Sequence, residues 1–89
     1  MDSRAAPGYL ETMEWDDEID ARGLLCPLPV LKARKYLKSL RPGQRLRLIA
    51  DDPAAVVDVP HFCAESGHLL ESQGQEAGAQ TYIIRKKPA

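Results

Sequence analysis

The sequence predicts a small α/β protein, an α+β two-layer sandwich in which two helices cover one face of a four-stranded mixed sheet. Short segments that alternate polar and apolar residues, as strands do, are separated by longer segments with helical periodicity. Their order along the chain is β-α-β-α-β-β. A strand, a helix and a second strand in succession form a right-handed crossover, so we expect both helices on one face of the sheet.

The chain has 89 residues, enough for one domain with a thin core. We expect this domain to span 16–87. Residues 1–15 mix Gly, Pro, Ser and acidic residues without periodicity, which predicts a flexible tail. Trp15 is the exception in that tail: either it covers an edge of the sheet, which we favour, or it is an exposed surface residue.

Four segments have the pattern or the composition of strands, and turn-forming residues at 74–78 join the last two as a hairpin. The second segment alternates most clearly and directs Leu46, Leu48 and Ala50 to one face. The predicted strands are 18–21, 45–50, 68–73 and 81–85.

The first helix is predicted from Pro27 to Leu40, and Pro42-Gly43 ends it. Because Pro29 disfavours helical dihedrals in the residue before it, we expect the first turn to be irregular or the helix to start two residues late. The apolar residues with the spacing of a buried stripe are Val30, Ala33, Leu37 and Leu40.

The second helix is predicted to start at Asp52-Pro53, an Asp cap followed by proline at the first helical position, and to end at Gly67. Pro60 lies inside it and is expected to kink or split it. The residues predicted for its inner face are Val56, Val59, Phe62 and Cys63.

Cys26 is the candidate catalytic residue, and it lies in the segment Gly23-Leu-Leu-Cys-Pro-Leu-Pro29 after the first predicted strand. Pro27 suits the first helical position, because its φ is fixed and its missing N–H would be unpaired there. Cys26 is therefore expected at the cap of a helix N-terminus, where free N–H groups and the helix dipole stabilise a thiolate. Since the thiolate is the nucleophilic form, the segment predicts a reactive cysteine.

Charged residues are expected close to Cys26, because loops that follow parallel strands meet at one edge of an open sheet. Those loops are 22–29 and 51–53, and their charged residues are Arg22, Asp51 and Asp52. The helix dipole and Arg22 would lower the pKa of the thiol, whereas the two carboxylates would raise it. We expect the dipole to dominate.

Each cysteine could instead be a packing residue of the core, because free cysteine is often a small buried residue. We favour burial for Cys63, on the apolar face of the second helix. For Cys26 we favour reactivity, since Pro27 and Pro29 shape an exposed helix start that a packing residue does not need. Pro29 also occupies the position where a Cys-x-x-Cys redox pair would have its second cysteine.

His61, Cys63 and His68 do not have the paired spacing of a metal site. We therefore expect no metal and no cofactor.

A basic face on the first helix is the candidate surface for partner docking. Such a face is often only a solvated surface, and both a solvated surface and a docking surface remain open. Its position directly after Cys26 and the neighbouring exposed leucine favour a protein contact. The docking candidates are Leu31, Arg34, Lys35 and Lys38.

Composition argues against several other classes of protein. The net charge of −1 gives no general reason to expect nucleic-acid or membrane binding. The start of the sequence has no secretory pattern, and two cysteines do not make a disulfide framework. We therefore expect a protein of the reducing cytoplasm, in which Cys26 stays available as a thiol.

Three motifs together resemble the TusA/SirA/YedF family of small sulfur-carrier proteins over residues 17–87. They are Gly23-x-x-Cys26-Pro27-x-Pro29, Asp51-Asp52-Pro53-Ala54 and Pro60-x-Phe62-Cys63. The resemblance implies the same two-layer fold, which is shared with the C-terminal domain of bacterial translation initiation factor three.

The resemblance also implies a chemistry, in which Cys26 carries sulfur as a persulfide and the chain is a sulfurtransferase only in the sense of a stoichiometric carrier. It implies a cysteine desulfurase or a rhodanese as sulfur donor. The acceptor would be a protein of tRNA thiolation, molybdenum-cofactor assembly or sulfur oxidation.

Two functions of other classes remain open. A regulatory binding module would use the basic helix face and not the thiol. Nucleic-acid binding rests on fold analogy alone, and the neutral net charge and scarce aromatic residues argue against it.

Overall fold

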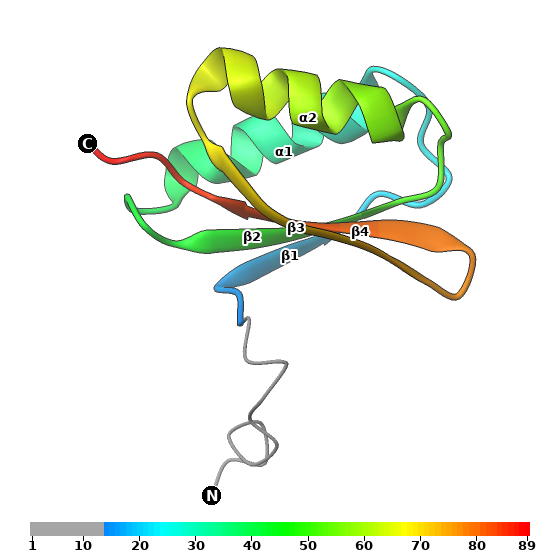
Figure 1. Ribbon diagram of the computed structural model, residues 1–89, viewed down its shortest axis with the longest axis horizontal. Coiled ribbons are helices and arrows are strands. Elements are labelled where there is room, and N and C mark those ends of the chain that lie inside the picture. The colour runs from blue at the N-terminus through cyan, green and yellow to red at the C-terminus, as the bar shows by residue number, and fades with distance from the viewer. Residues whose placement is uncertain (1–13) are drawn as a thin grey trace, which may run out of the picture.

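The computed structural model describes residues 14–89, so most of the predicted tail, 1–15, lies outside the described residues. The chain folds into two layers, with two helices on one face of a four-stranded sheet (Figure 1). This confirms the predicted fold class and order. The elements are β1 (Asp17–Asp20), α1 (Leu28–Ser39), β2 (Arg45–Ala50), α2 (Ala55–Ser66), β3 (Leu69–Glu76) and β4 (Ala79–Arg85).

The sheet is mixed, and its strand order is β1-β2-β4-β3. β1 pairs with β2 in parallel, with Ile19 opposite Leu48, as a strand–helix–strand crossover requires. β4 pairs antiparallel with both β2 and β3. The crossover places the loops after β1 and β2 at the same end of the sheet, where the site described below lies.

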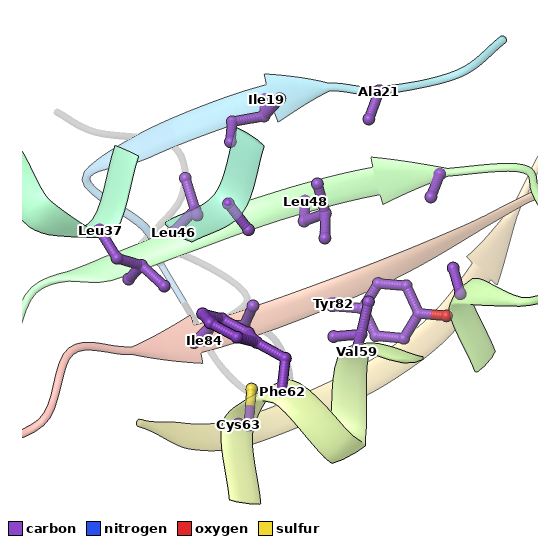
Figure 2. Close-up of a cluster of buried hydrophobic side chains, with 13 residues drawn as sticks. Ile19, Ala21, Leu37, Leu46, Leu48, Val59, Phe62, Cys63, Tyr82 and Ile84 are labelled. Carbon is purple, nitrogen blue, oxygen red and sulfur yellow. The ribbon is translucent and has the colours of Figure 1, made fainter. Parts of the chain in front are cut away.

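The core lies between the helices and the sheet (Figure 2). β2 directs every second residue inward, and Leu46, Leu48 and Ala50 are fully buried. Leu37 of α1 and Val59 of α2 pack over them from the helical layer. The other strand residues of this cluster are Ile19, Tyr82 and Ile84.

Both helices start after their first proline, but α1 is not delayed by two residues, because Leu28 is helical despite the Pro29 that follows it. In α1, Pro27 is the cap and Leu28 is the first helical residue, and the helix ends at Ser39 rather than Leu40. In α2, the first helical residue is Ala55, two positions after Pro53.

The late start of α2 has its cause in Asp52. Its side-chain Oδ1 accepts a hydrogen bond from the N–H of Ala54 at 3.1 Å, and its carbonyl accepts one from Ala55 at 2.9 Å. Asp52 and the next two residues therefore form a turn before the helix.

The prediction that Val56 belongs to the inner face of α2 is wrong, because its side chain is 51% exposed. Ala55 takes the inner position instead, at the spacing that leads to Val59, Phe62 and Cys63. Pro60 does not split α2, which continues through it to Ser66.

The β3–β4 hairpin has a tighter turn than predicted. β3 continues to Glu76 and β4 begins at Ala79, so only Ala77 and Gly78 connect them. Both connecting residues have positive φ, 51° and 82°, as a two-residue turn between twisted strands requires. The segment 74–76, which has turn composition, is therefore strand.

Trp15 lies against the open face of the sheet and not over an edge. The guanidinium of Arg47, on the central strand β2, is 4.8 Å from the centre of the Trp15 ring. Arg47 also pairs with Glu18 of β1 and Glu76 of β3. Because Trp15 stays 42% exposed, it covers this face only in part.

Candidate functional site

Cys26 lies in the loop between β1 and α1, and its side chain is exposed. Figure 1 shows this loop, in cyan, beside the start of α2. The N–H of Cys26 donates a hydrogen bond to Oδ2 of Asp52 at 2.6 Å, and the N–H of Gly23 donates to Oδ1 of Asp51 at 3.0 Å. The structure therefore brings both carboxylates to the Cys26 loop and uses them to fix its backbone.

Arg22 forms an ion pair with Asp20. Its Nε and Nη2 donate to the two carboxylate oxygens of Asp20 at 2.9 and 2.8 Å. This bidentate pairing lowers the pKa of Asp20 to about 2. The expectation that Arg22 lowers the pKa of the Cys26 thiol is therefore wrong, because its charge is paired with Asp20.

Cys26 opens onto a groove of about 410 Å³ between α1 and α2. Phe62 is almost fully buried beneath the groove, and the guanidinium of Arg34 lies over its ring at 5.5 Å. The groove is lined by Cys26, Pro27, Val30, Arg34, Asp58, His61, Phe62, Glu65 and Ser66.

The pKa of the Cys26 thiol is raised, which contradicts the expectation that the helix dipole dominates. The largest cause is the carboxylate of Asp58, which lines the same groove, followed by desolvation and by the negative charge of Asp52. Asp58 was missed from the sequence. It is an ordinary acid in the first turn of α2, and only the packing of that helix brings it to Cys26.

Comparison with known proteins shows the family of this chain. The model of the family described as Sulfurtransferase TusA matches residues 17–86, which include Cys26, Asp52 and Asp58. The chain belongs to the TusA sulfurtransferase family.

Two relatives show how much of a TusA-family protein this chain contains. "Sulfur carrier protein TusA" of Pseudomonas entomophila is 46% identical over 72 residues, which are 81% of this chain and 90% of the relative. The protein of the same name from Allochromatium vinosum is 41% identical over 73 residues, 82% of this chain and 96% of the relative.

A solved structure supports the fold. A SirA-like protein of Desulfitobacterium hafniense superposes with a TM-score of 0.72 at 25% sequence identity. The match covers 81% of this chain and 99% of that protein. The two-layer fold of this TusA-family chain is therefore the fold of a whole small protein.

The second cysteine is built into the core. Cys63 is 3% exposed, and burial raises the pKa of its thiol to about 11. Because a thiol that is both buried and protonated is a poor nucleophile, Cys63 acts as a small apolar residue in α2.

The predicted docking residues all lie on α1, and all are exposed. Leu31 and Lys35 border a second depression of about 490 Å³ on that helix. Arg34 instead lines the Cys26 groove, and Lys38 lies further along α1, close to its C-terminal end. The predicted set is thus divided between two sides of the helix.

The described residues offer no metal centre and no membrane span. Within 14–89, no three His, Cys, Asp or Glu side chains gather as metal ligands would. In the same part of the chain, neither helix has the length and apolarity needed to cross a bilayer.

Proposed function

We propose that this chain is a sulfur carrier, which accepts sulfane sulfur on Cys26 as a persulfide and relays it to an acceptor protein. The observation that carries the proposal is the contrast between the exposed Cys26 and the buried Cys63. The names of the TusA-family relatives, which this chain matches over most of its length, support the same role.

The loading step is a thiol exchange on the donor's persulfide. The Cys26 thiolate attacks the terminal sulfur, a new S–S bond forms, and the donor's own S–S bond breaks. The bonding electron pair leaves with the donor, which becomes a thiolate and takes up a proton. Delivery repeats the exchange in the opposite sense, with an acceptor thiolate attacking the terminal sulfur on Cys26.

An exposed loop position suits both steps, because the donor and acceptor must each bring a sulfur atom into bonding contact with the same thiol. Pro27 and Pro29 support this position because they are the cap and the second residue of α1, directly after Cys26. Asp51 and Asp52 support it by fixing the loop backbone. Cys26 is therefore held in an exposed position that a donor protein and an acceptor protein can each reach.

The partners we propose are a cysteine desulfurase or a rhodanese as donor and a sulfur-accepting protein of tRNA thiolation, molybdenum-cofactor assembly or sulfur oxidation. Both would dock along α1, where Leu31 is exposed in the half nearer the Cys26 loop, and Lys35 and Lys38 are exposed further toward the C-terminal end. A reducing cytoplasm is the compartment that keeps Cys26 free for this exchange.

The proposal is tested by incubating the chain with a cysteine desulfurase and cysteine and measuring the intact mass. Loading should add one sulfur atom, about 32 Da, and a reductant should remove it. Cys26→Ser should remain unloaded, whereas Cys63→Ser should load if it folds. The absence of an adduct with desulfurases and rhodaneses alike would contradict the proposal.

A second candidate is a regulatory binding module that does not use the thiol. It is favoured by the leucines around the start of α1, since Leu25, Leu28 and Leu31 are 68%, 46% and 48% exposed. Cys26→Ser distinguishes the two functions, because it would abolish sulfur transfer and leave this binding intact.

A further inference from the structure

The start of α1 provides few hydrogen-bond donors for a thiolate on Cys26. Helix N-termini stabilise anions through the free N–H groups of the first turn. Pro27 and Pro29 have no N–H, and the N–H of Leu28 donates to the carbonyl of Leu25 at 2.8 Å. The same prolines that place Cys26 at a helix start therefore remove much of the usual stabilisation of a thiolate.

The opposite wall of the groove adds negative charge. Asp58 projects from the first turn of α2, is half-buried, and lines the groove together with Cys26. Within residues 14–89, no basic side chain forms an ion pair with Asp58. Among these described residues, its charge therefore acts on the thiol without a basic partner in an ion pair.

The other charged groups around the groove leave Asp58 as the main influence. On α2, His61 pairs with Glu65 at 3.4 Å. On α1, the guanidinium of Arg34 lies over the ring of Phe62. Asp52, in the loop, accepts the backbone N–H of Cys26. The pKa of the Cys26 thiol is raised, with the carboxylate of Asp58 as the first cause, which agrees with this arrangement.

We propose that Asp58 is a positioning residue that restrains Cys26 in the free carrier. It keeps the Cys26 thiol protonated when no sulfur is bound to it. When Cys26 carries a persulfide, Asp58 slows the transfer of its terminal sulfur to small thiols such as glutathione. The second part rests on the proposed carrier function, whereas the first part concerns the unloaded chain alone.

The restraint on loaded sulfur follows from the chemistry of exchange. A glutathione thiolate attacks the terminal sulfur of the Cys26 persulfide and forms a new S–S bond. The old S–S bond breaks, and its electron pair leaves on Sγ of Cys26, which is then protonated by solvent. A thiolate whose conjugate thiol has a raised pKa is a poorer leaving group, so Asp58 slows this loss.

The test compares the full chain with Asp58→Asn and with Asp17→Asn, a matched control at the start of β1. The first measurement is the rate of iodoacetamide labelling of Cys26 against pH. Asp58→Asn should move the profile to lower pH. A profile that moves by one pH unit should raise the labelling rate at neutral pH about threefold, because tenfold more thiolate is partly offset by its lower nucleophilicity.

The second measurement loads the three proteins with sulfur and follows its loss to glutathione by intact mass. Asp58→Asn should lose sulfur severalfold faster, and Asp17→Asn should match the unmodified chain. An unchanged labelling profile in Asp58→Asn, or an equal displacement in Asp17→Asn, would overturn the role of Asp58. Failure of every protein to load would contradict the carrier function instead, while the labelling profiles would still decide the role of Asp58.

Discussion

Cys26 and Cys63 have different chemistry because the fold gives them different surroundings. Cys26 is exposed in a loop, and Asp58 raises the pKa of its thiol. Cys63 lies in the core, where burial raises the pKa of its thiol to about 11. Accessibility, rather than an unusually low pKa, is therefore what separates the two thiols.

A labelling experiment tests this contrast. A short pulse of iodoacetamide at neutral pH should modify Cys26 well before Cys63, because only Cys26 can be reached without opening the core. Peptide mapping of the labelled chain gives the order of reaction. Equal or faster labelling of Cys63 would show that the assignment of roles is wrong.

The sequence predicted the exposure of Cys26, which the structure confirms, but not the direction in which its surroundings shift the pKa of the thiol. The motif around Cys26 indicated an exposed helix start, and the neighbouring loops correctly placed Asp51 and Asp52 beside it. Asp58 could not be found in this way, because its approach to Cys26 depends on how α2 is rotated against α1. Periodicity gives the buried face of each helix, but not which residues of two helices meet across a groove.

At the scale of the elements, the strands and helices follow from periodicity, whereas their ends do not. The start of α2 depends on how Asp52 satisfies the N–H groups that follow it, which moves the first helical residue to Ala55. That shift is why Val56 faces solvent and Ala55 faces the core.

Two matched substitutions in α2 test this corrected inner face. Val59→Ala should lower the free energy of unfolding by about 2 kcal/mol, because it removes fully buried methyl groups and leaves a cavity. Val56→Ala should change it by less than about 0.5 kcal/mol, because that side chain is exposed. Urea unfolding of the two variants measures the difference, and equal losses would contradict the placement.

Glu71, on β3, forms ion pairs with arginines of two other strands, β2 and β4. Its carboxylate accepts hydrogen bonds from Nε of Arg45 in β2 and Nε of Arg85 in β4, both at 2.7 Å. Partial burial tends to raise the pKa of Glu71, but the two arginines outweigh it and lower the pKa. Since the folded-state pKa is depressed, this stabilisation is present above the unfolded-state pKa and is lost as pH falls through the folded-state value.

Glu71→Gln should therefore destabilise the chain at pH 7 by about 1 kcal/mol, a value reduced for the partial exposure of both arginines. The difference from the unmodified chain should shrink at an acid pH low enough to protonate Glu71 in the folded chain, because its depressed pKa delays protonation until the pH has fallen below the unfolded-state value. Urea unfolding at the two pH values measures it. A difference that is the same at both would mean that charge is not what Glu71 contributes.

At the scale of the whole molecule, the parallel crossover gathers the site at one end of the sheet, and α1 extends from it with a charged outer surface. Complementary charge on a partner chiefly raises the association rate and sets orientation. This is the role that we assign to Arg34, Lys35 and Lys38.

Reversing the charge of these three residues should slow sulfur acceptance from a desulfurase at low donor concentration. The fold should persist, because exposed substitutions are typically tolerated within about 0.5 kcal/mol each. The defect should shrink in high salt, which screens the advantage of the unmodified chain. Arg41→Glu, at an exposed position beyond the end of α1, controls for a general change in charge. An unchanged rate in the triple variant would mean that these three residues are only solvated.

The central claim is that sulfur is carried on Cys26, and locating the sulfur tests it most directly. The chain is loaded with a desulfurase and cysteine, the persulfide is trapped by alkylation, and the peptides that contain Cys26 and Cys63 are analysed by mass. The extra sulfur should be found on the Cys26 peptide alone, and on neither peptide in Cys26→Ser. Sulfur on the Cys63 peptide, or loading that survives Cys26→Ser, would contradict the claim.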